Sequence, residues 1–372
     1  MYMGFAIYNT WRLFSMKVTI SENRIWSFVI VAFLVKIIFF LYLKWFPETN
    51  LFGGGNDADY YHGYAVGYYK VVTNYWPIFL RFLNELNLYN REKLTYILFG
   101  VSIILLPFFY YQIVKIKDYE FNLVKASSIL LVIFYPSIFF YATDIYRDIF
   151  MFIILLICFF IYKKILESNR IVSYFYFLIY LCLSYFLFLL RDYLGIALIL
   201  SPFVYSILLK TKKYIKTWIV VYCVILILLK IFGRLDEVLS YREGFSHGGT
   251  TIGIKLLNQN SFMFLFYYLY SLIVQLFGLF IVNLLSLFTF IFESVPFTLA
   301  FIYLIKNVKF MDKFVIFLLT FFVIYTSIWL LGNDNLGTAT RLRIPSYLVI
   351  FACMFIVYQR KMIIGFKTLK NE

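Results

Sequence analysis

Charged side chains are scarce in this sequence. Asp, Glu, Lys and Arg make up 14% of its 372 residues, whereas a soluble globular domain is about 25% charged. Hydrophobic residues make up 63% of the chain, and the mean hydropathy is +0.85. This composition excludes an ordinary soluble domain and predicts a protein that crosses a membrane several times.

Cysteine and histidine are also rare, with four and two copies. All four cysteines lie inside apolar runs, which is typical of small buried side chains and not of a disulfide framework or a metal site. The chain has no GxGxxG, P-loop, HExxH or CxxC pattern and no visible internal repeat. We therefore expect no cofactor and no metal, although Asp59, in the first outer loop, is an acid that could bind a divalent metal.

Long apolar runs, in contrast, are abundant. A helix needs about 20 apolar residues to cross the hydrocarbon core, and windows of that length predict ten spans. They are 25–46, 94–114, 124–141, 145–162, 172–190, 193–209, 218–232, 287–305, 314–331 and 344–358. The apolar stretch 261–286 is interpreted as a re-entrant or in-plane helix. The expected fold is one all-α membrane domain over residues 1–372, with long outer loops at about 47–93 and 233–260.

The net charge of +15 follows the expected topology. With the N-terminus in the cytoplasm, the inner segments hold 20 bases against six acids, and the outer segments hold 13 bases against 12 acids. An excess of Lys and Arg on the cytoplasmic side is the usual pattern in membrane proteins. The basic charge therefore needs no nucleic-acid partner to explain it, and both termini are expected to be cytoplasmic.

The most polar stretch of the first outer loop comes soon after the first span. It holds three consecutive glycines at 53–55, then Asp57, Asp59, Tyr60 and His62. Consecutive glycines let a backbone lie close to a membrane or a ligand. An acid in this position can be a solvated loop charge, a metal ligand or a catalytic base.

Further charges occur at the outer ends of the later spans. These ends carry Arg147, Asp148, Arg191, Asp192, Arg341 and Arg343. Ionisable groups at membrane depth are costly and usually face a cavity or each other. Arginine suits bidentate recognition of phosphate, so this set favours a lipid-linked phosphate or pyrophosphate. Helix-end ion pairs, interfacial anchors and plain loop charges are the structural alternatives.

Three short patches, in this order, resemble membrane glycosyltransferases of the GT-C type. They are Asp57-Ala-Asp-Tyr-Tyr61 after span one, Tyr135-Pro-Ser137 through Arg147-Asp148, and Arg341-Leu-Arg-Ile-Pro345 before the last span. In size, number of spans and aromatic-rich composition the chain is also similar to bacterial O-antigen and capsular polysaccharide polymerases. The resemblance implies a GT-C-like helical bundle in the bacterial cytoplasmic (inner) membrane.

The same resemblance implies an enzyme that joins sugars or repeat units carried on polyprenyl (pyro)phosphate at the outer face. Asp57 would be the general base. The expected phosphate-binding residues are Arg147, Arg191, Arg341 and Arg343, and the expected supporting residues are Asp59, Tyr60, His62, Asp148 and Asp192. Expected partners are polyprenyl-linked sugars, membrane lipid, and the chain-length regulator and flippase of the same pathway.

Two alternatives stay open. One is a transferase that adds a single sugar from a polyprenyl-phosphate donor. The other is a flippase or transporter for the same lipid-linked unit. Transporters often show internal repeats and broken helices near the membrane midplane, whereas the polar groups of this chain gather at the outer ends of the expected spans.

The charge distribution makes a testable prediction about topology. Reporter fusions at Gly63, Lys213, Gly248 and Lys367 should report outside, inside, outside and inside, because the basic excess selects the cytoplasmic side. A cytoplasmic signal at Gly248 would contradict the topology from the seventh expected span onward.

Overall fold

The computed structural model describes residues 22–46, 56–72, 74–117, 119, 121–211, 215–244 and 251–370. Within these residues the regular elements are all helices, apart from one isolated β-bridge between Thr251 and Asn335. The expected all-α class is therefore confirmed. The three glycines at 53–55 lie outside the described residues.

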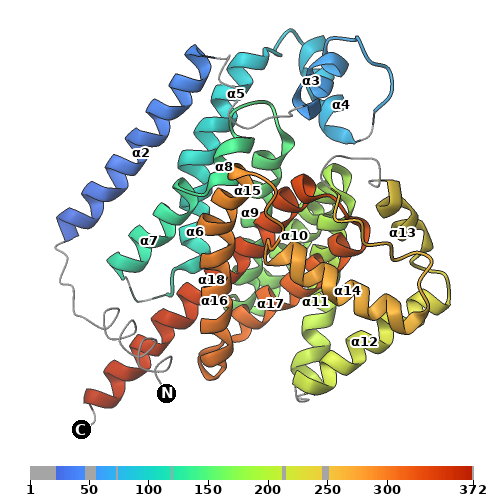
Figure 1. The fold of residues 1–372 in the computed structure, drawn as a ribbon. Coiled ribbons are helices and arrows are strands. Elements are labelled where there is room, and N and C mark those ends of the chain that lie inside the picture. The colour runs from blue at the N-terminus through green and yellow to red at the C-terminus, as the bar shows by residue number, and fades with distance from the viewer. Residues whose placement is uncertain are drawn as a thin grey trace.

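Figure 1 shows the arrangement of the helices. In chain order they are α2 (Glu22–Trp45), α3 (Asn56–Ala65), α4 (Tyr75–Glu85), α5 (Arg91–Gly100), η1 (Val101–Leu105), α6 (Leu106–Val114), α7 (Asn122–Ile133), α8 (Pro136–Tyr141), α9 (Arg147–Glu167), α10 (Arg170–Leu190), α11 (Asp192–Thr211), α12 (Ile215–Ile231), α13 (Asp236–Glu243), α14 (Ser261–Leu276), α15 (Leu284–Thr289), η3 (Phe290–Ser294), α16 (Val295–Lys306), η4 (Val308–Phe310), α17 (Lys313–Gly332) and α18 (Leu336–Lys370).

Eight helical segments in the described residues are long and apolar enough to cross a bilayer. They are Ile25–Trp45, Arg91–Val114, Arg147–Glu167, Arg170–Leu190, Asp192–Lys210, Leu284–Lys306, Lys313–Gly332 and Leu336–Gly365. Each overlaps one of the ten expected spans. The chain is thus a multi-pass helical membrane protein.

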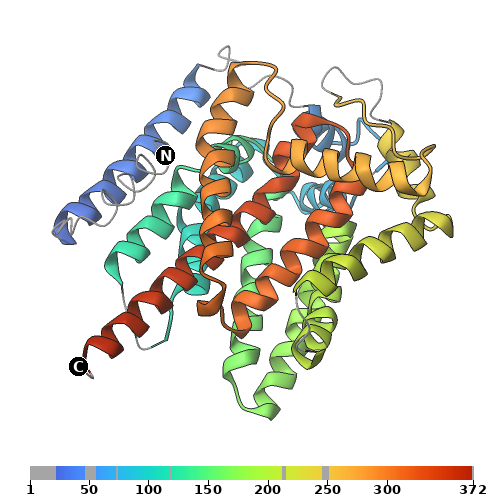
Figure 2. The ribbon, with the colours of Figure 1, turned by 60° about the horizontal axis from the view of Figure 1, so that its bottom comes forward.

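The remaining two expected spans are not among these eight long segments. The expected span 124–141 is divided into α7 and α8, because Pro136 disfavours a helical conformation at Tyr135, whose backbone is extended. The expected span 218–232 corresponds to α12, whose 17 residues include 218–231. The stretch 261–286 contains α14, which runs crosswise to α16 (Figures 1 and 2). Residues 284–286 of the stretch belong to α15.

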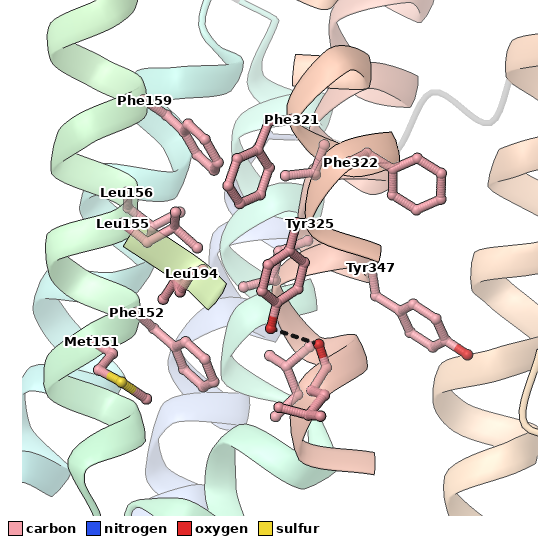
Figure 3. Close-up of a cluster of buried hydrophobic side chains, with 14 of the residues drawn as sticks. Met151, Phe152, Leu155, Leu156, Phe159, Leu194, Phe321, Phe322, Tyr325 and Tyr347 are labelled. Carbon is pink, nitrogen blue, oxygen red and sulfur yellow. Dashed lines mark hydrogen bonds between the residues drawn. The ribbon is translucent and has the colours of Figure 1, made fainter. Parts of the chain in front are cut away.

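The core of the bundle lies around α9 and α17. Buried positions make up 61% of the span in α9 and 67% of that in α17, against 17% in α10. A helix that is apolar on every side is stable only when other helices or lipid surround it. Figure 3 shows Phe152 and Phe159 of α9 facing Phe321 and Tyr325 of α17. The Tyr325 hydroxyl donates to the carbonyl oxygen of Leu342, 2.9 Å away, and so joins α17 to α18.

Two spans contain a π-helical turn just before a proline. Pro107 follows η1, and Pro296 follows η3. Proline has no N–H, and its ring clashes with the carbonyl four residues earlier, so a wider turn at that point relieves the conflict. In η3 this turn places the side chains of Glu293 and Ser294 in the interior, where both are fully buried.

A buried arginine fastens the segment after α13 to the bundle. The Arg242 guanidinium forms an ion pair with Asp334 at 2.6 Å and donates to the carbonyl oxygens of Leu330 at 2.7 Å and Ile254 at 3.1 Å. The second oxygen of Asp334 accepts the backbone N–H of Gly253 at 2.9 Å. These bonds tie the junction of α17 and α18 to the chain that leads into α14.

Removing this arginine should destabilise the fold strongly. Arg242→Gln leaves Asp334 buried without its partner, a change that costs about 3–5 kcal/mol in other proteins. Thermal unfolding of the purified protein in detergent would measure the loss. The control is Arg81→Gln, which breaks the exposed pair with Glu85 and should cost at most about 1 kcal/mol. Equal effects of the two substitutions would show that the buried pair does not stabilise the bundle.

Candidate functional site

Four helix ends bring charged side chains together at one end of the bundle. They are the start of α3, the start of α9, the junction of α10 with α11, and the start of α18. Arg341 of α18 is at the centre. Its Nε donates to Asp148 Oδ1 at 2.6 Å, and its Nη2 pairs with Asp148 Oδ2. Its Nη1 donates to Asp57 Oδ2 at 2.5 Å, so one guanidinium joins two carboxylates.

Asp148 is the buried acid of this group. It lies in the first turn of α9, where the helix dipole favours a negative charge, and it is fully buried. Arg341 is buried with it and lies over the ring of Tyr141, with 5.2 Å from guanidinium carbon to ring centre. A buried carboxylate needs such charge-assisted partners, because desolvation otherwise makes its charge very costly.

Arg191 approaches the same carboxylate between α10 and α11. A close turn puts it there: a Cβ on Gly195 would lie 2.4 Å from the Phe188 Cα, so only glycine lets the two helices approach this closely. Arg191 Nη1 is 3.7 Å from Asp148 Oδ1, which is an ion pair but too long for a hydrogen bond. Its guanidinium lies 5.1 Å from the ring centre of Tyr193.

Arg147 is the third arginine at this end. Its Nη1 donates to the carbonyl oxygen of Leu190 at 2.8 Å. The Nε atoms of Arg147 and Arg191 are both buried and have no hydrogen-bond acceptor among the described residues. Buried donors without acceptors are rare and costly in proteins, so this end of the bundle has spare capacity to bind an anion.

The charge on Arg191 is secure. Burial and the neighbouring Arg341 lower the pKa of this guanidinium, but the negative charges of ionised Tyr193 and of Asp148 oppose that effect and leave the pKa above its ordinary value. We define the arginine cluster as Arg147, Arg191, Arg341, Asp57 and Asp148. It holds three positive charges against two negative ones, and an anion would balance it.

Asp57 is the accessible member of the arginine cluster. It lies in the first turn of α3, whereas the sequence suggested a loop made adaptable by glycines. Its side chain is 53% exposed, compared with 1% for Asp148. Trp76 fixes this part of the chain, because its indole N–H donates to the carbonyl oxygen of Ile145 at 2.9 Å, next to the start of α9.

Arg343 lies outside the arginine cluster, so the structure brings together three of the four expected phosphate-binding arginines. Two residues along an α-helix correspond to a rotation of about 200°, which turns Arg343 away from Asp148. Its partner is Glu293 of η3, at 3.9 Å. Glu293 Oε1 accepts both the backbone N–H and the hydroxyl of Ser137, at 2.8 and 2.6 Å.

Asp59 also has a different partner from Asp57. It pairs with Arg91 at 2.8 Å, and the same guanidinium holds Asp144 at 2.6 Å. Arg91 therefore links α3 to the turn between α8 and α9, and sequence reasoning missed it. No local pattern marks it, since its two partners are 32 and 53 residues away.

The other expected supporting residues make local contacts outside the arginine cluster. His62 Nδ1 lies 2.9 Å from the Tyr89 hydroxyl, and the Tyr60 hydroxyl donates to the carbonyl oxygen of Val71 at 2.8 Å. Asp192 is exposed and accepts the backbone N–H of Tyr193 at 3.0 Å. Over the part of the chain that the structure describes, His, Cys, Asp and Glu form no group of three that could hold a metal ion.

Comparisons with protein-family models, curated proteins and solved structures found no match to this chain.

The two acids of the arginine cluster should respond differently to substitution. Asp148→Asn removes the buried charge that Arg341 and Arg191 face, and we expect a loss of about 3–5 kcal/mol, as for other broken buried pairs. Asp57→Asn should cost at most about 1 kcal/mol, because that carboxylate is half exposed. Thermal unfolding in detergent checks both values, with Asp192→Asn as the exposed control. An Asp148→Asn protein as stable as the control would contradict the structural role given to Asp148.

Proposed function

We propose that this protein is a membrane glycosyltransferase that joins sugars or repeat units carried on polyprenyl (pyro)phosphate. In its most specific form the proposal is an O-antigen-type polymerase of a bacterial cytoplasmic membrane. The observation that carries it is a pair of buried guanidinium groups, Arg147 and Arg191, whose Nε atoms have no acceptor among the described residues. Arg191 is linked to the accessible carboxylate of Asp57 through Asp148 and Arg341.

The arginines fit the leaving group of such a reaction. A lipid (pyro)phosphate bears several negative oxygens, and guanidinium groups bind such oxygens in pairs. The Tyr193 ring and the Asp148 carboxylate hold the Arg191 guanidinium in place. Neither contact is a hydrogen bond, so the N–H groups of Arg191 are not used by these two residues. Donors fixed before the reaction stabilise the charge that grows on the departing phosphate without a reorganisation cost.

Asp57 fits the role of general base. A sugar hydroxyl oxygen would form the new bond to the anomeric carbon of the donor, while the bond from that carbon to the (pyro)phosphate oxygen breaks. The hydroxyl proton would pass to Asp57, and the electron pair of the broken bond would leave with the phosphate. Arg341 donates to Oδ2 of Asp57 and so orients the carboxylate. The Asp57 side chain is half-exposed, so an acceptor sugar can reach it.

Deleting the gene distinguishes this proposal from its alternatives. A surface polysaccharide reduced to one repeat unit is the result expected for a polymerase. A full-length ladder with altered antigenicity would indicate a transferase that adds a single sugar. Lipid-linked units that accumulate on the cytoplasmic side would indicate a flippase instead.

Asp57→Asn should abolish chain extension, because it keeps the shape of the side chain and removes the proton acceptor. General-base assistance is worth about 10²–10⁴-fold in rate. The matched control is Asp59→Asn, two residues along the same helix, whose carboxylate pairs with Arg91; its effect should be smaller. The measurement is the polymer ladder at matched amounts of protein in the membrane. A wild-type ladder from the Asp57→Asn strain would remove Asp57 from the mechanism.

A further inference from the structure

A basic cavity lies at the opposite end of the bundle from the arginine cluster. Helix α9 runs from one to the other, and its 21 residues correspond to about 30 Å. The cavity measures about 570 Å³ and lies between the ends of α6 and α9, the start of α17 and the later part of α18. Its basic residues are Lys115, Lys117, Lys163, Lys313 and Arg360.

The two acids that line this cavity already have partners. Asp312 pairs with Arg360 and also accepts the backbone N–H of Val315 at 2.8 Å, which caps α17. Glu167 pairs with Lys164 at 3.1 Å. Among the described residues, no ion pair neutralises Lys115, Lys117 or Lys313, so the cavity keeps an excess of positive charge.

Lys163 fixes one of these charges at the wall of the cavity. Its ammonium donates to the carbonyl oxygens of Gln112 at 3.0 Å and Ile113 at 2.9 Å, at the end of α6. It also lies 5.8 Å from the ring centre of Phe314. Without Lys163, the end of α6 would present unpaired carbonyl oxygens and the negative end of the helix dipole to the cavity. The Lys163 ammonium binds these carbonyls and so reduces their repulsion of an anion in the cavity.

The rest of the lining is apolar. Ile316 and Ile356 line the cavity together with Leu166. A free phosphate ion would use the basic residues and leave this apolar surface unused. A lipid uses both parts, because its headgroup is charged and its acyl chains are not.

We propose that the basic cavity binds the phosphate headgroup of an anionic membrane phospholipid, with the start of an acyl chain along Ile316 and Ile356. This proposal does not depend on the proposed enzymatic function, since it concerns other residues at the other end of the bundle. A lipid in this position would hold together the ends of α6, α9, α17 and α18.

The test uses the full-length protein purified in a neutral detergent. Its melting temperature is followed while phosphatidylglycerol, phosphatidylcholine or inorganic phosphate is added. We expect phosphatidylglycerol to raise the melting temperature and the other two to have little effect. The double variant Lys115→Gln/Lys313→Gln should bind phosphatidylglycerol about 10-fold more weakly or worse. The matched control, Lys70→Gln/Lys93→Gln, removes two exposed lysines near α3 and α5.

Three results would overturn the proposal. The first is equal stabilisation by phosphatidylglycerol and phosphatidylcholine, and the second is an unchanged affinity in the double variant. The third is full stabilisation by inorganic phosphate alone, which would assign the cavity to a soluble anion. If the double variant does not fold, Lys313→Gln alone decides, because this exposed side chain at the start of α17 contributes no packing.

Discussion

Arg341 and Asp148 form an ion pair away from water, where the second turn of α18 meets the first turn of α9. The two residues are 193 positions apart in the chain, so the pair forms only when α9 and α18 have come together. Burying two charges costs several kcal/mol for each ion unless they satisfy one another. The same pair orients Asp57 through the remaining amino group of Arg341 and draws Arg191 toward the site. The ion pair that this part of the bundle needs for its stability therefore also positions Asp57 and Arg191 in the candidate site.

The apolar core gives this pair a fixed frame. Rings from α9 and α17 pack against each other, as Tyr162 and Phe317 do with their centres 3.5 Å apart, and this packing sets the relative height of the helices. Two further polar contacts hold the neighbouring parts: Arg242 with Asp334, and Glu293 with the start of α8. The polar groups of the interior therefore act as specific connections between helices, whereas the apolar residues supply most of the burial.

The sequence alone predicted the class of fold well, because the length and apolarity of a membrane span are local properties. The division of the expected span 124–141 was harder to predict, since it depends on the backbone at one proline. The sequence grouped Asp57, Arg147, Arg191 and Arg341 by their common expected membrane depth, and the structure places these four at one end of the bundle; their role as site residues stays a prediction. The expectation for Arg343 missed the rotation between neighbours on a helix. The contact of Arg91 with Asp59 and Asp144 depends on tertiary structure, which no spacing in the chain reveals.

The central claim is that the arginine cluster binds the (pyro)phosphate of a lipid carrier. Its most direct test is the equilibrium binding of undecaprenyl pyrophosphate to the full-length protein in lipid nanodiscs, compared between the parent and Arg191→Lys. Lysine keeps the charge but lacks the planar pair of donors, and charge-assisted hydrogen bonds are worth about 1.5–3 kcal/mol each. The account predicts binding at least about 10-fold weaker for Arg191→Lys, with Arg81→Lys unchanged. Equal affinities of the parent and Arg191→Lys, at equal folded amounts, would contradict it.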